Sequence, residues 1–506
     1  MKRIMRFLGV LCFICGLVIL LWGKRFEKSG SSVRANLIAF NQAMNIVVKN
    51  YVCEVDPTRL LEDAMRGMLQ SLDPYSVYLD AKELSEFEVH TKGRFGGLGI
   101  RIDVRDGWIT VISPIEGTPA YRAGLLPGDK IVEIEGESTR GMTVGDAVKV
   151  LRGKPGTDVT ITIAREGVDE PFEVTITRAL INIPAVQYAG IIEDGIGYIR
   201  LSDFSANAYR EFAYYLDSLE GEGACKFIVD LRNNPGGLLD QAVDIAGCFV
   251  GKNREIVTVK GRDRYGERVI RSRGWDEGFP VVVLVNGASA SASEIVAGAI
   301  QDWDRGLIIG TRTYGKGSVQ NIFELSNGGA VKLTTAKYYT PSGRCIDRTT
   351  HGEVVKIDSS EVDTTKVYRT VGELKREVHG GGGINPDILV EEKDVSSLVK
   401  KIYAKGAFFD FAVWYTARYD VGKRFSVDDK VWQMFIDFLR EKGVEFWEDE
   451  IDACKEEVER FLYLAILETK WGIKARYAAS LMDDEYVMKA LEVLRNAEKP
   501  EDVFKF

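Results

Sequence analysis

Hydrophobic positions change their spacing along the chain, and these changes divide it into regions of different predicted structure. Between residues 36 and 72 apolar side chains recur every three or four residues, which predicts two amphipathic helices. Asp56 and Pro57 provide an N-cap and a first-turn residue for the second helix. From about 93 to 178 short β-rich runs alternate with Gly and Pro turns. We therefore expect an N-terminal helical region over 29–92 and a small β-rich domain over 93–178.

Strand-like and helix-like stretches then alternate from residue 196 to residue 340, the pattern of an α/β core. The predicted strands are KFIVDL (226–231), VVVLV (281–285) and LIIG (307–310), and the predicted helices span about 238–250 and 291–301. Residues 347–383 are polar and end in GGGG, which predicts an inserted flap within a core that extends over 179–400. Past residue 400 amphipathic periodicity returns, so 401–506 are expected to form a C-terminal helical region.

The N-terminus has the pattern of a targeting segment. Residues 7–23 contain no charged side chain and follow Lys2, Arg3 and Arg6, as in an export signal or a membrane anchor. No small-residue cleavage site follows this run, which favours an uncleaved anchor over a cleaved signal for residues 1–28. We expect export to the cell envelope, with the N-terminal segment in the inner membrane and the body of the protein in the periplasm.

Composition narrows the classes of function. The 506 residues are 45% hydrophobic and 28% charged, which indicates a folded protein of several domains rather than a disordered chain. The formal net charge of -9 repels phosphate backbones, so no nucleic-acid partner is expected. The seven cysteines and three histidines show neither metal-ligand nor disulfide spacing. We therefore predict neither a metal site nor a cofactor.

One segment has the form of a strand, a sharp turn and a helix that could carry a nucleophile. In VVVLVNGASASASEIVAGAI (281–300) an apolar strand ends at an Asn-Gly turn, and small residues lead into a helix. A serine at a helix start lies beside free backbone N–H groups that can stabilise an oxyanion. Ser291 and Glu294 also fit the capping box S-x-x-E, which needs no catalysis. On this segment alone the cap is favoured.

A serine hydroxyl needs a base before it can act as a nucleophile. None of the three histidines lies within 50 residues of Ser291, and the other candidate is Lys316 in TYGKGSVQ (313–320). Glycines flank this lysine and allow close packing, and burial would lower its pKa enough to supply a neutral amine. Gln320 could hold that amine by a hydrogen bond without adding charge. The alternative is a solvated surface lysine in a glycine turn.

Two glycine-rich segments could bind negative charge on backbone N–H groups. In DLRNNPGG (230–237), Gly236 or Gly237 could donate to an oxyanion beside the N–H of Ala292, although an ordinary strand-to-helix turn fits equally well. In FGGLGI (95–100) a glycine loop enters a strand, which suits a chain-terminal carboxylate while a peptide adds to the sheet edge. The peptide-binding residues there would be Gly97, Leu98, Gly99 and Ile100.

Together and in this order, these blocks resemble the carboxyl-terminal processing serine peptidases. The resemblance covers most of residues 36–395. It is carried by SLDPYSVYL (71–79), FGGLGI, PAYRAGLLPGD (119–129), DLRNNPGG, SASASE (289–294), YGKGSVQ, PSGRCI (341–346) and GINPDI (383–388). It implies an α/β fold with a ClpP/crotonase-like protease core, a PDZ domain at 93–178, and flanking helical regions.

The resemblance also implies roles for individual residues. In this family the serine and lysine lie 25 positions apart and a glutamine follows four positions later, which selects Ser291 as nucleophile, Lys316 as base and Gln320 as its partner. The implied activity is that of a serine endopeptidase which cleaves exported proteins near their C-termini. The PDZ domain would engage the free C-terminal end of a protein or peptide substrate and gate the active site. The helical N- and C-terminal regions are candidates for homo-oligomer contacts.

Two other functions stay open at this point. One is a catalytically silent PDZ scaffold, against which the complete set of Ser291, Lys316 and Gln320 argues. The other is a Ser/His peptidase of the same fold that uses His351 or His379.

Overall fold

The computed structural model describes residues 32–262, 265–274, 278–350, 353–354, 367–391, 393–422 and 424–505. Two compact units can be distinguished: residues 32–81 with Ile322–Leu333, and Lys82–Asn321 with the chain from Thr334 onward. The apolar segment 7–23, interpreted above as an anchor, lies outside the described residues. Among the residues of these seven ranges, no helix has both the length and the apolar character needed to cross a bilayer.

The first unit contains helices, the strand β1 (Val77–Leu79) and residues Ile322–Leu333, which join β17 (Ser318–Glu324) to β18 (Ala330–Tyr339). Residues 32–50 are helical, and α2 (Pro57–Gln70) follows with Asp56 as its N-cap, whose side chain accepts a hydrogen bond from the Thr58 N–H. The strand β1 pairs antiparallel with the beginning of β18. The two helices and the N-cap expected for this region are therefore present.

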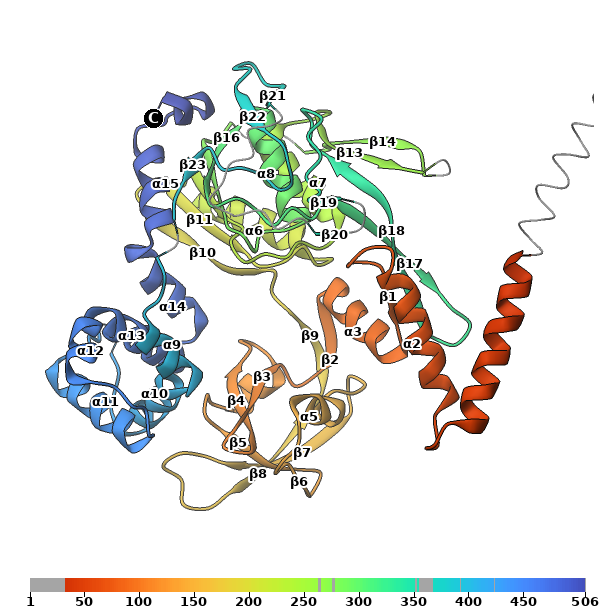
Figure 1. Ribbon diagram of the computed structural model, residues 1–506. Coiled ribbons are helices and arrows are strands. Elements are labelled where there is room, and N and C mark those ends of the chain that lie inside the picture. Colours follow the sequence, from red (N-terminus) through yellow and green to blue (C-terminus); the bar gives the residue numbers. More distant parts are fainter. Residues whose placement is uncertain are drawn as a thin grey trace, which may run out of the picture. The chain divides into compact units, whose positions relative to one another are not determined.

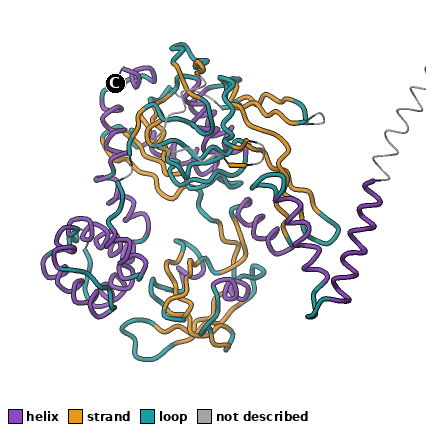
Figure 2. The backbone as a smooth tube through the Cα atoms, viewed as in Figure 1, coloured by secondary structure: helices purple, strands orange, loops and turns teal. Residues whose placement is uncertain are grey.

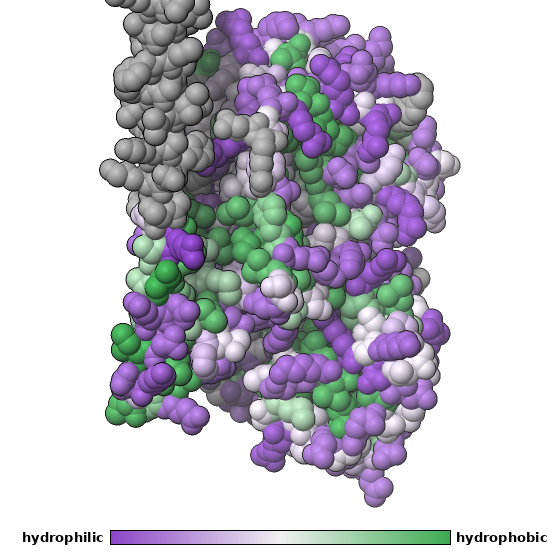
Figure 3. All heavy atoms as spheres, turned by 90° about the vertical axis from the view of Figure 1, so that its right-hand side faces the viewer, coloured by the Kyte–Doolittle hydropathy of each residue, from purple (hydrophilic) through white to green (hydrophobic). Residues whose placement is uncertain are grey.

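The helix over 32–50 leaves many apolar side chains in contact with solvent. In Figure 3 it continues below the grey N-terminal atoms, with green side chains along it. The exposed apolar residues of this helix are Val33, Leu37, Ile38, Phe40, Ile46, Val47 and Val48. Rows of exposed apolar residues mark interaction surfaces. Self-association through the helical regions stays a prediction, and this row is its candidate surface.

The second unit is organised around a six-stranded sheet (Figure 1). Its order is β10 (Val186–Glu193), β11 (Ile196–Leu201), β12 (Lys226–Asp230), β15 (Val281–Val285), β16 (Gly306–Gly310) and β23 (Ile388–Leu389). β10 runs antiparallel to β11, and the remaining neighbours are parallel. Successive residues of a strand point to opposite faces of the sheet. The apolar strands of this sheet therefore contribute side chains to two hydrophobic cores, one on each face.

Helices cover both faces of this sheet. On one face α6 (Ala208–Gly221), α7 (Leu239–Val250) and α8 (Ala292–Asp302) bury Phe227, Val229 and Val283. On the other face α15 (Glu485–Arg495) buries the intervening residues Ile228 and Val282. The helix α15 is therefore part of the core of this sheet, although the sequence pattern places it in a separate C-terminal region.

A second sheet and part of the predicted flap lie beside this core. The sheet contains β13 (Glu255–Gly261), β14 (Glu267–Arg271), β17 (Ser318–Glu324) and β18. The described parts of 347–383 form the short strands β19 (Thr349–Thr350), β20 (Glu353–Val354), β21 (Val367–Arg369) and β22 (Glu377–His379). Thr370 and Val378 are buried, and Arg376 forms ion pairs with Asp304 and Asp387. This second half of the insertion is packed against the body of the protein and is not a free flap.

The β-rich domain is attached to the core by a two-stranded ladder. The helix α3 (Ala81–Lys92) leads into β2 (Arg94–Gly97), which pairs antiparallel with β9 (Ala179–Asn182), so the chain enters and leaves the domain at one place. The domain sheet has the order β3 (Ile100–Arg105), β4 (Trp108–Pro114), β5 (Lys130–Ile134), β7 (Asp158–Ala164) and β8 (Phe172–Thr177), with β6 (Glu137–Ser138) beside β5 and the helices α4 (Pro119–Arg122) and α5 (Val144–Leu151). β3 is the terminal strand of this sheet.

Six helices of the described chain lie between residues 397 and 480 (Figure 2), and the first five of them share a separate aromatic core. They are α9 (Ser397–Ala404), α10 (Ala407–Arg418), α11 (Asp429–Glu441), α12 (Glu448–Ala453), α13 (Lys455–Trp471) and α14 (Ile473–Ser480). Phe411 of α10 and Phe435 of α11 are fully buried in it. The short helix η1 (Leu481–Asp483) joins these helices to α15, and η2 (Pro500–Lys505) follows.

Candidate active site

Two loops meet at the carboxyl edge of the parallel strands, where ligand sites occur in α/β sheets. The loop after β12 contains Asn233, and the loop after β15 begins with Asn286. The Asn233 N–H donates to Asn286 Oδ1 at 2.9 Å, and Asn286 Nδ2 donates to Asn233 Oδ1 at 3.0 Å. These reciprocal bonds bring the DLRNNPGG and SASASE segments together.

The structure separates the three serines of the second loop. Ser289 is buried, and its hydroxyl donates to the Leu231 carbonyl at 2.7 Å. Ser293 is also buried, and its hydroxyl donates to the Asn234 carbonyl at 2.9 Å. Ser291 is partly exposed. The first two hydroxyls therefore support the loops, while Ser291 is the serine that a substrate can reach.

Ser291 also has an unusual backbone. Its φ is 56° and its ψ is -109°, so it lies outside the regions that non-glycine residues ordinarily occupy. Such strain is maintained only where the surroundings hold the residue, and it is frequent at active sites. Ser291 immediately precedes α8, as expected for a nucleophile at a helix start.

Glu294 holds Ser291 and Lys316 in place through their backbones. One carboxylate oxygen, Oε2, accepts from the Ser291 N–H at 2.7 Å and from the Lys316 N–H at 2.9 Å. The other oxygen accepts from Thr313 Oγ1 at 2.6 Å and from the Gly315 N–H at 2.7 Å. The Glu294 side chain is fully buried, and burial raises its pKa against the effect of these hydrogen bonds.

The Lys316 turn has the close packing that its glycines indicated. Gly315 has φ of 85°, and a Cβ at Gly317 would lie 2.3 Å from the Asp347 nitrogen, so neither position accepts a larger residue without strain. Gln320 Nε2 donates to Ser318 Oγ at 2.8 Å and lies 3.4 Å from Thr334 Oγ1. With its NH2 group used in this way, Gln320 has its carbonyl oxygen to offer to a neighbouring amine.

Of the candidate oxyanion donors, Gly236 lies beside Ser291 and Ala292, but its N–H already has an acceptor. A Cβ at Gly236 would lie 2.9 Å from both the Ala292 nitrogen and Ser291 Cβ. The Gly236 N–H, however, donates to Asn234 Oδ1 at 2.9 Å. Ala292 is the first residue of α8, where N–H groups have no acceptor within the helix. We therefore retain Ala292 and Gly237 as candidate donors and remove Gly236.

An ion network lies under the DLRNNPGG loop. Asp230 is fully buried at the end of β12 and pairs with Arg232 at 2.6 Å and with Arg200 at 2.7 Å. Tyr198 donates to the same carboxylate at 2.5 Å. Burial by itself would raise the pKa of Asp230, but the two guanidinium groups outweigh it and lower that pKa to about 2. Asp230 is therefore a carboxylate at neutral pH.

The histidines do not form a comparable arrangement in the part of the chain that the structure describes. The His379 carbonyl accepts from Arg344, which pairs with Asp302 at the last residue of α8. Ser291 precedes the first residue of that helix, whose 11 residues span roughly 16 Å. His351 lies outside the described residues. The Lys316 backbone, in contrast, is joined to that of Ser291 through Glu294, and the role of Lys316 as base stays a prediction.

The carbonyl groups of the glycine loop of the β-rich domain point towards residues 115–120. The Leu98 carbonyl accepts from the Ala120 N–H at 3.0 Å, and the Gly99 carbonyl accepts from the Ile115 N–H at 2.8 Å. In a trans peptide the N–H points opposite to the C=O, so the N–H groups of Gly99 and Ile100 face away from residues 115–120. A Cβ at Gly99, whose φ is 82°, would lie 2.3 Å from Thr118 Cβ. Gly97 lies in the ladder with β9 and does not share this geometry.

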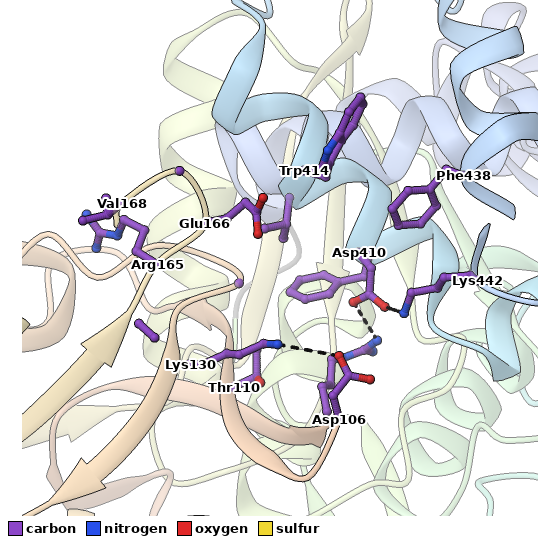
Figure 4. Close-up of a pocket in the computed structure, with 16 residues that line it drawn as sticks. Asp106, Thr110, Lys130, Arg165, Glu166, Val168, Asp410, Trp414, Phe438 and Lys442 are labelled. Atoms are coloured by element: carbon purple, nitrogen blue, oxygen red, sulfur yellow. Dashed lines mark hydrogen bonds and ion pairs between the residues drawn. The ribbon is translucent and has the colours of Figure 1, made fainter. Parts of the chain in front are cut away.

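The far end of the edge strand β3 contacts the helices of the 397–480 region. Arg105 ends β3 and pairs with Asp410 of α10 at 3.4 Å, and Glu166 pairs with Arg418 at 2.8 Å. A cavity of about 450 Å³ lies between these parts, and in Figure 4 Asp410 is joined by a dashed line to Lys442, the C-cap of α11. This cavity is distinct from the loops around Ser291.

Sequence reasoning missed two of the residues that organise the site. Glu294 forms the capping box that its spacing from Ser291 predicts, but the pattern did not indicate its further contacts with Thr313, Gly315 and Lys316. Asp484 bonds Arg232 in the DLRNNPGG loop at 2.8 and 3.0 Å. No local sequence pattern identifies a partner 252 positions away.

Comparisons with known proteins show which family this chain is similar to. The sequence model of peptidase family S41 matches residues 195–358, that of the PDZ domain matches 110–165, and that of the N-terminal domain of the activating protease CtpB matches 23–83. A carboxy-terminal-processing protease of Bartonella bacilliformis is 44% identical over 316 residues, which are 61% of this chain and 72% of that protein. The carboxy-terminal processing protease CtpA of Bacillus subtilis is 35% identical over 351 residues, 68% of this chain and 75% of that one.

Among solved structures, a photosystem II D1 C-terminal processing protease is 28% identical. The alignment covers 70% of this chain and 92% of that one, with a TM-score of 0.37.

Proposed function

Since the chain belongs to the carboxy-terminal processing proteases of peptidase family S41, we propose that it is a Ser/Lys endopeptidase which cleaves exported proteins near their C-termini. Ser291 is the nucleophile and Lys316 is its base. The observation that carries this assignment is the Glu294 oxygen that accepts from the backbone N–H groups of both residues. Because each nitrogen lies within 3 Å of that oxygen, the two nitrogens lie within about 6 Å of each other.

The proposed reaction uses only groups of this chain. The neutral Lys316 amine takes the hydroxyl proton as Ser291 Oγ attacks the scissile carbonyl, and the N–H groups of Ala292 and Gly237 stabilise the oxyanion. The resulting ammonium then protonates the leaving amine, and water hydrolyses the acyl-enzyme with Lys316 again as base. Gln320 orients the amine without adding a charge that would keep it protonated.

The PDZ domain selects substrates by their free C-terminal end. The N–H groups of Gly99 and Ile100 bind the terminal carboxylate, and the substrate adds to β3 as a further strand. Ile100 and Ile102 of β3 pack against the apolar core of the domain, which suits an apolar final side chain. This binding couples to catalysis only if it favours the open, assembled site over a closed one.

We expect a peptide with a free apolar C-terminus to be cleaved with roughly tenfold higher kcat/KM than the same peptide amidated, because amidation removes the charge that these N–H groups bind. Gly99→Ala should abolish this difference, since its Cβ collides with Thr118. Gly107→Ala is the matched control, because Gly107 has a similar φ of 80° but open space around its Cβ. Equal cleavage of free and amidated peptides by the unaltered enzyme would show that the domain does not recognise chain ends.

The cellular location rests on residues 7–23, which precede the described part of the chain. Positive charges before an apolar segment favour the cytoplasmic side, which directs the peptidase body outward. We expect protease added to spheroplasts to digest the body of the protein. Protection in intact spheroplasts, with digestion only after lysis, would contradict this location.

A further inference from the structure

The N-cap of helix α15, Asp484, contacts the loop of the candidate oxyanion donors. Arg232 Nη1 donates to Asp484 Oδ1 at 3.0 Å, and Arg232 Nη2 donates to Asp484 Oδ2 at 2.8 Å. The Arg232 guanidinium also lies 4.7 Å from the ring centroid of Tyr486. Paired hydrogen bonds of this kind fix the plane of a guanidinium as well as its position.

We propose that Asp484 is a positioning residue for the peptidase reaction: it fixes Arg232 and, through it, the conformation of residues 232–237 that presents an N–H group to the oxyanion. The inference rests on the proposed function. Asp484 lies outside the S41 match at 195–358. The inference therefore assigns the C-terminal segment a role in positioning the active-site loop.

Arg232 transmits the position of Asp484 to the backbone of its own loop. Its Nε donates to Asp230 Oδ1 at 3.0 Å, and its backbone N–H donates to the same oxygen at 2.9 Å. The side chain and the main chain of Arg232 thus both bind Asp230, while Asp484 accepts from Nη1 and shares Nη2 with Asp230. Only 10% of the Arg232 side chain is exposed, so water cannot easily replace a lost partner.

The loop beyond Arg232 reaches Ser291 through a continuous series of contacts. Asn233 has φ of 60° and is held in this strained form by its reciprocal bonds with Asn286. The Asn234 carbonyl accepts from the Ala290 N–H at 3.0 Å and from Ser293 Oγ at 2.9 Å. A shift of Arg232 would therefore move Ala290 and Ser293, the contacts on either side of Ser291. It would also move Gly237, which lies further along the same loop.

Asp484 has a second role, and the chemistry of asparagine separates the two. Its Oδ1 also accepts from the N–H groups of Tyr486 at 3.0 Å and Val487 at 3.2 Å, which caps α15. Asparagine is as good an N-cap as aspartate, so Asp484→Asn keeps the cap through Oδ1. It removes the negative charge and replaces Oδ2, the acceptor of Arg232 Nη2, with an NH2 donor, so the paired bonds to Arg232 are lost. The helix keeps its other attachments, from Lys226 to the Leu494 and Arg495 carbonyls and from Arg495 to Glu193.

The test compares Asp484→Asn with Glu193→Gln, which weakens an ion pair of the same helix that is remote from Arg232. Each full-length variant is assayed for kcat and KM on one peptide, for the inhibition constant of a peptide boronate that mimics the oxyanion, and for thermal unfolding. We expect Asp484→Asn to lower kcat roughly tenfold, to leave KM within about twofold, and to weaken the boronate by a factor similar to that in kcat, since oxyanion donors act on the transition state. Glu193→Gln should match the wild type.

A double variant tests the route through Arg232. Arg232→Lys keeps the positive charge but loses the fork that binds both carboxylates. If Asp484 acts through Arg232, Asp484→Asn should add little to the loss that Arg232→Lys causes by itself.

Three results would overturn the inference. One is an Asp484→Asn enzyme with unchanged kcat and boronate affinity, and another is a rise in KM alone. The third is an equal loss of activity in Glu193→Gln together with a lower unfolding temperature, which would show that α15 serves only stability. A wild-type enzyme without turnover or boronate binding would overturn the proposed function first, and this inference with it.

Discussion

Ser291→Ala is expected to lower peptide cleavage by at least roughly 10³-fold, because the substitution removes the proposed nucleophile and leaves only binding and oxyanion stabilisation. The free energy of unfolding should change by no more than about 1 kcal/mol, the usual cost of a hydroxyl at a helix start. The measurements are peptide turnover and denaturant unfolding of the same preparation. Alanine keeps the Cβ, so the strained backbone of residue 291 is not relieved by the change.

Ser289→Ala and Ser293→Ala are the matched controls for this prediction. Each removes a buried hydroxyl that donates to a loop carbonyl, so each should cost about 1 to 2 kcal/mol of stability while the folded enzyme still turns over. A dead Ser289→Ala or Ser293→Ala enzyme beside an active Ser291→Ala enzyme would place the nucleophile elsewhere in the segment.

Lys316→Arg should also be inactive, by at least roughly 10³-fold, because a guanidinium stays protonated and cannot take a proton from serine. Lys337→Arg is the control, because Lys337 lies in β18, which pairs with β17, the strand that follows Lys316. Lys337 is partly exposed and forms an ion pair with Asp347 at 3.2 Å, which arginine can replace. For each of the two variants, we would measure peptide turnover and the rate of reaction with a reagent that labels an active-site serine.

The same experiment separates the two possible bases. A Lys316→Arg enzyme with substantial turnover would remove the dyad and direct attention to a Ser/His arrangement, which His351→Ala would then test. An inactive Lys316→Arg enzyme beside an active His379→Ala enzyme would agree with the placement of His379 at the opposite end of α8 from Ser291.

Much of the core could be predicted because its elements are periodic and local. VVVLV forms β15, and the segment after its Asn-Gly turn forms α8. The change from a continuous apolar run to small residues and a helical pattern predicts both elements. The S41 and PDZ matches confirm the predicted α/β protease with its PDZ domain. Local signals of this kind are strong in long apolar segments, where burial leaves little choice of structure.

Features that depend on distant residues could not be predicted. The pattern of α15 indicated an amphipathic helix, but no periodicity shows that its apolar stripe covers Ile228 and Val282 of the core sheet. The Gly236 N–H was an expected donor, yet the Asn234 side chain two positions earlier takes it. The second half of the polar insertion was expected to be a flap, and the Arg376 ion pairs hold it to the body instead.

The buried carboxylate of Glu294 limits how this enzyme can be switched. Because one oxygen joins the backbones at Ser291 and Lys316, separating the two residues would leave a buried carboxylate short of partners at a cost of about 3 kcal/mol or more. A regulator can more cheaply rotate the Lys316 side chain, displace Gln320 or block the entry of substrate. Inactive and active forms of the enzyme should therefore share one rigid serine and lysine backbone, and inhibitors that mimic only this backbone geometry would not discriminate between them.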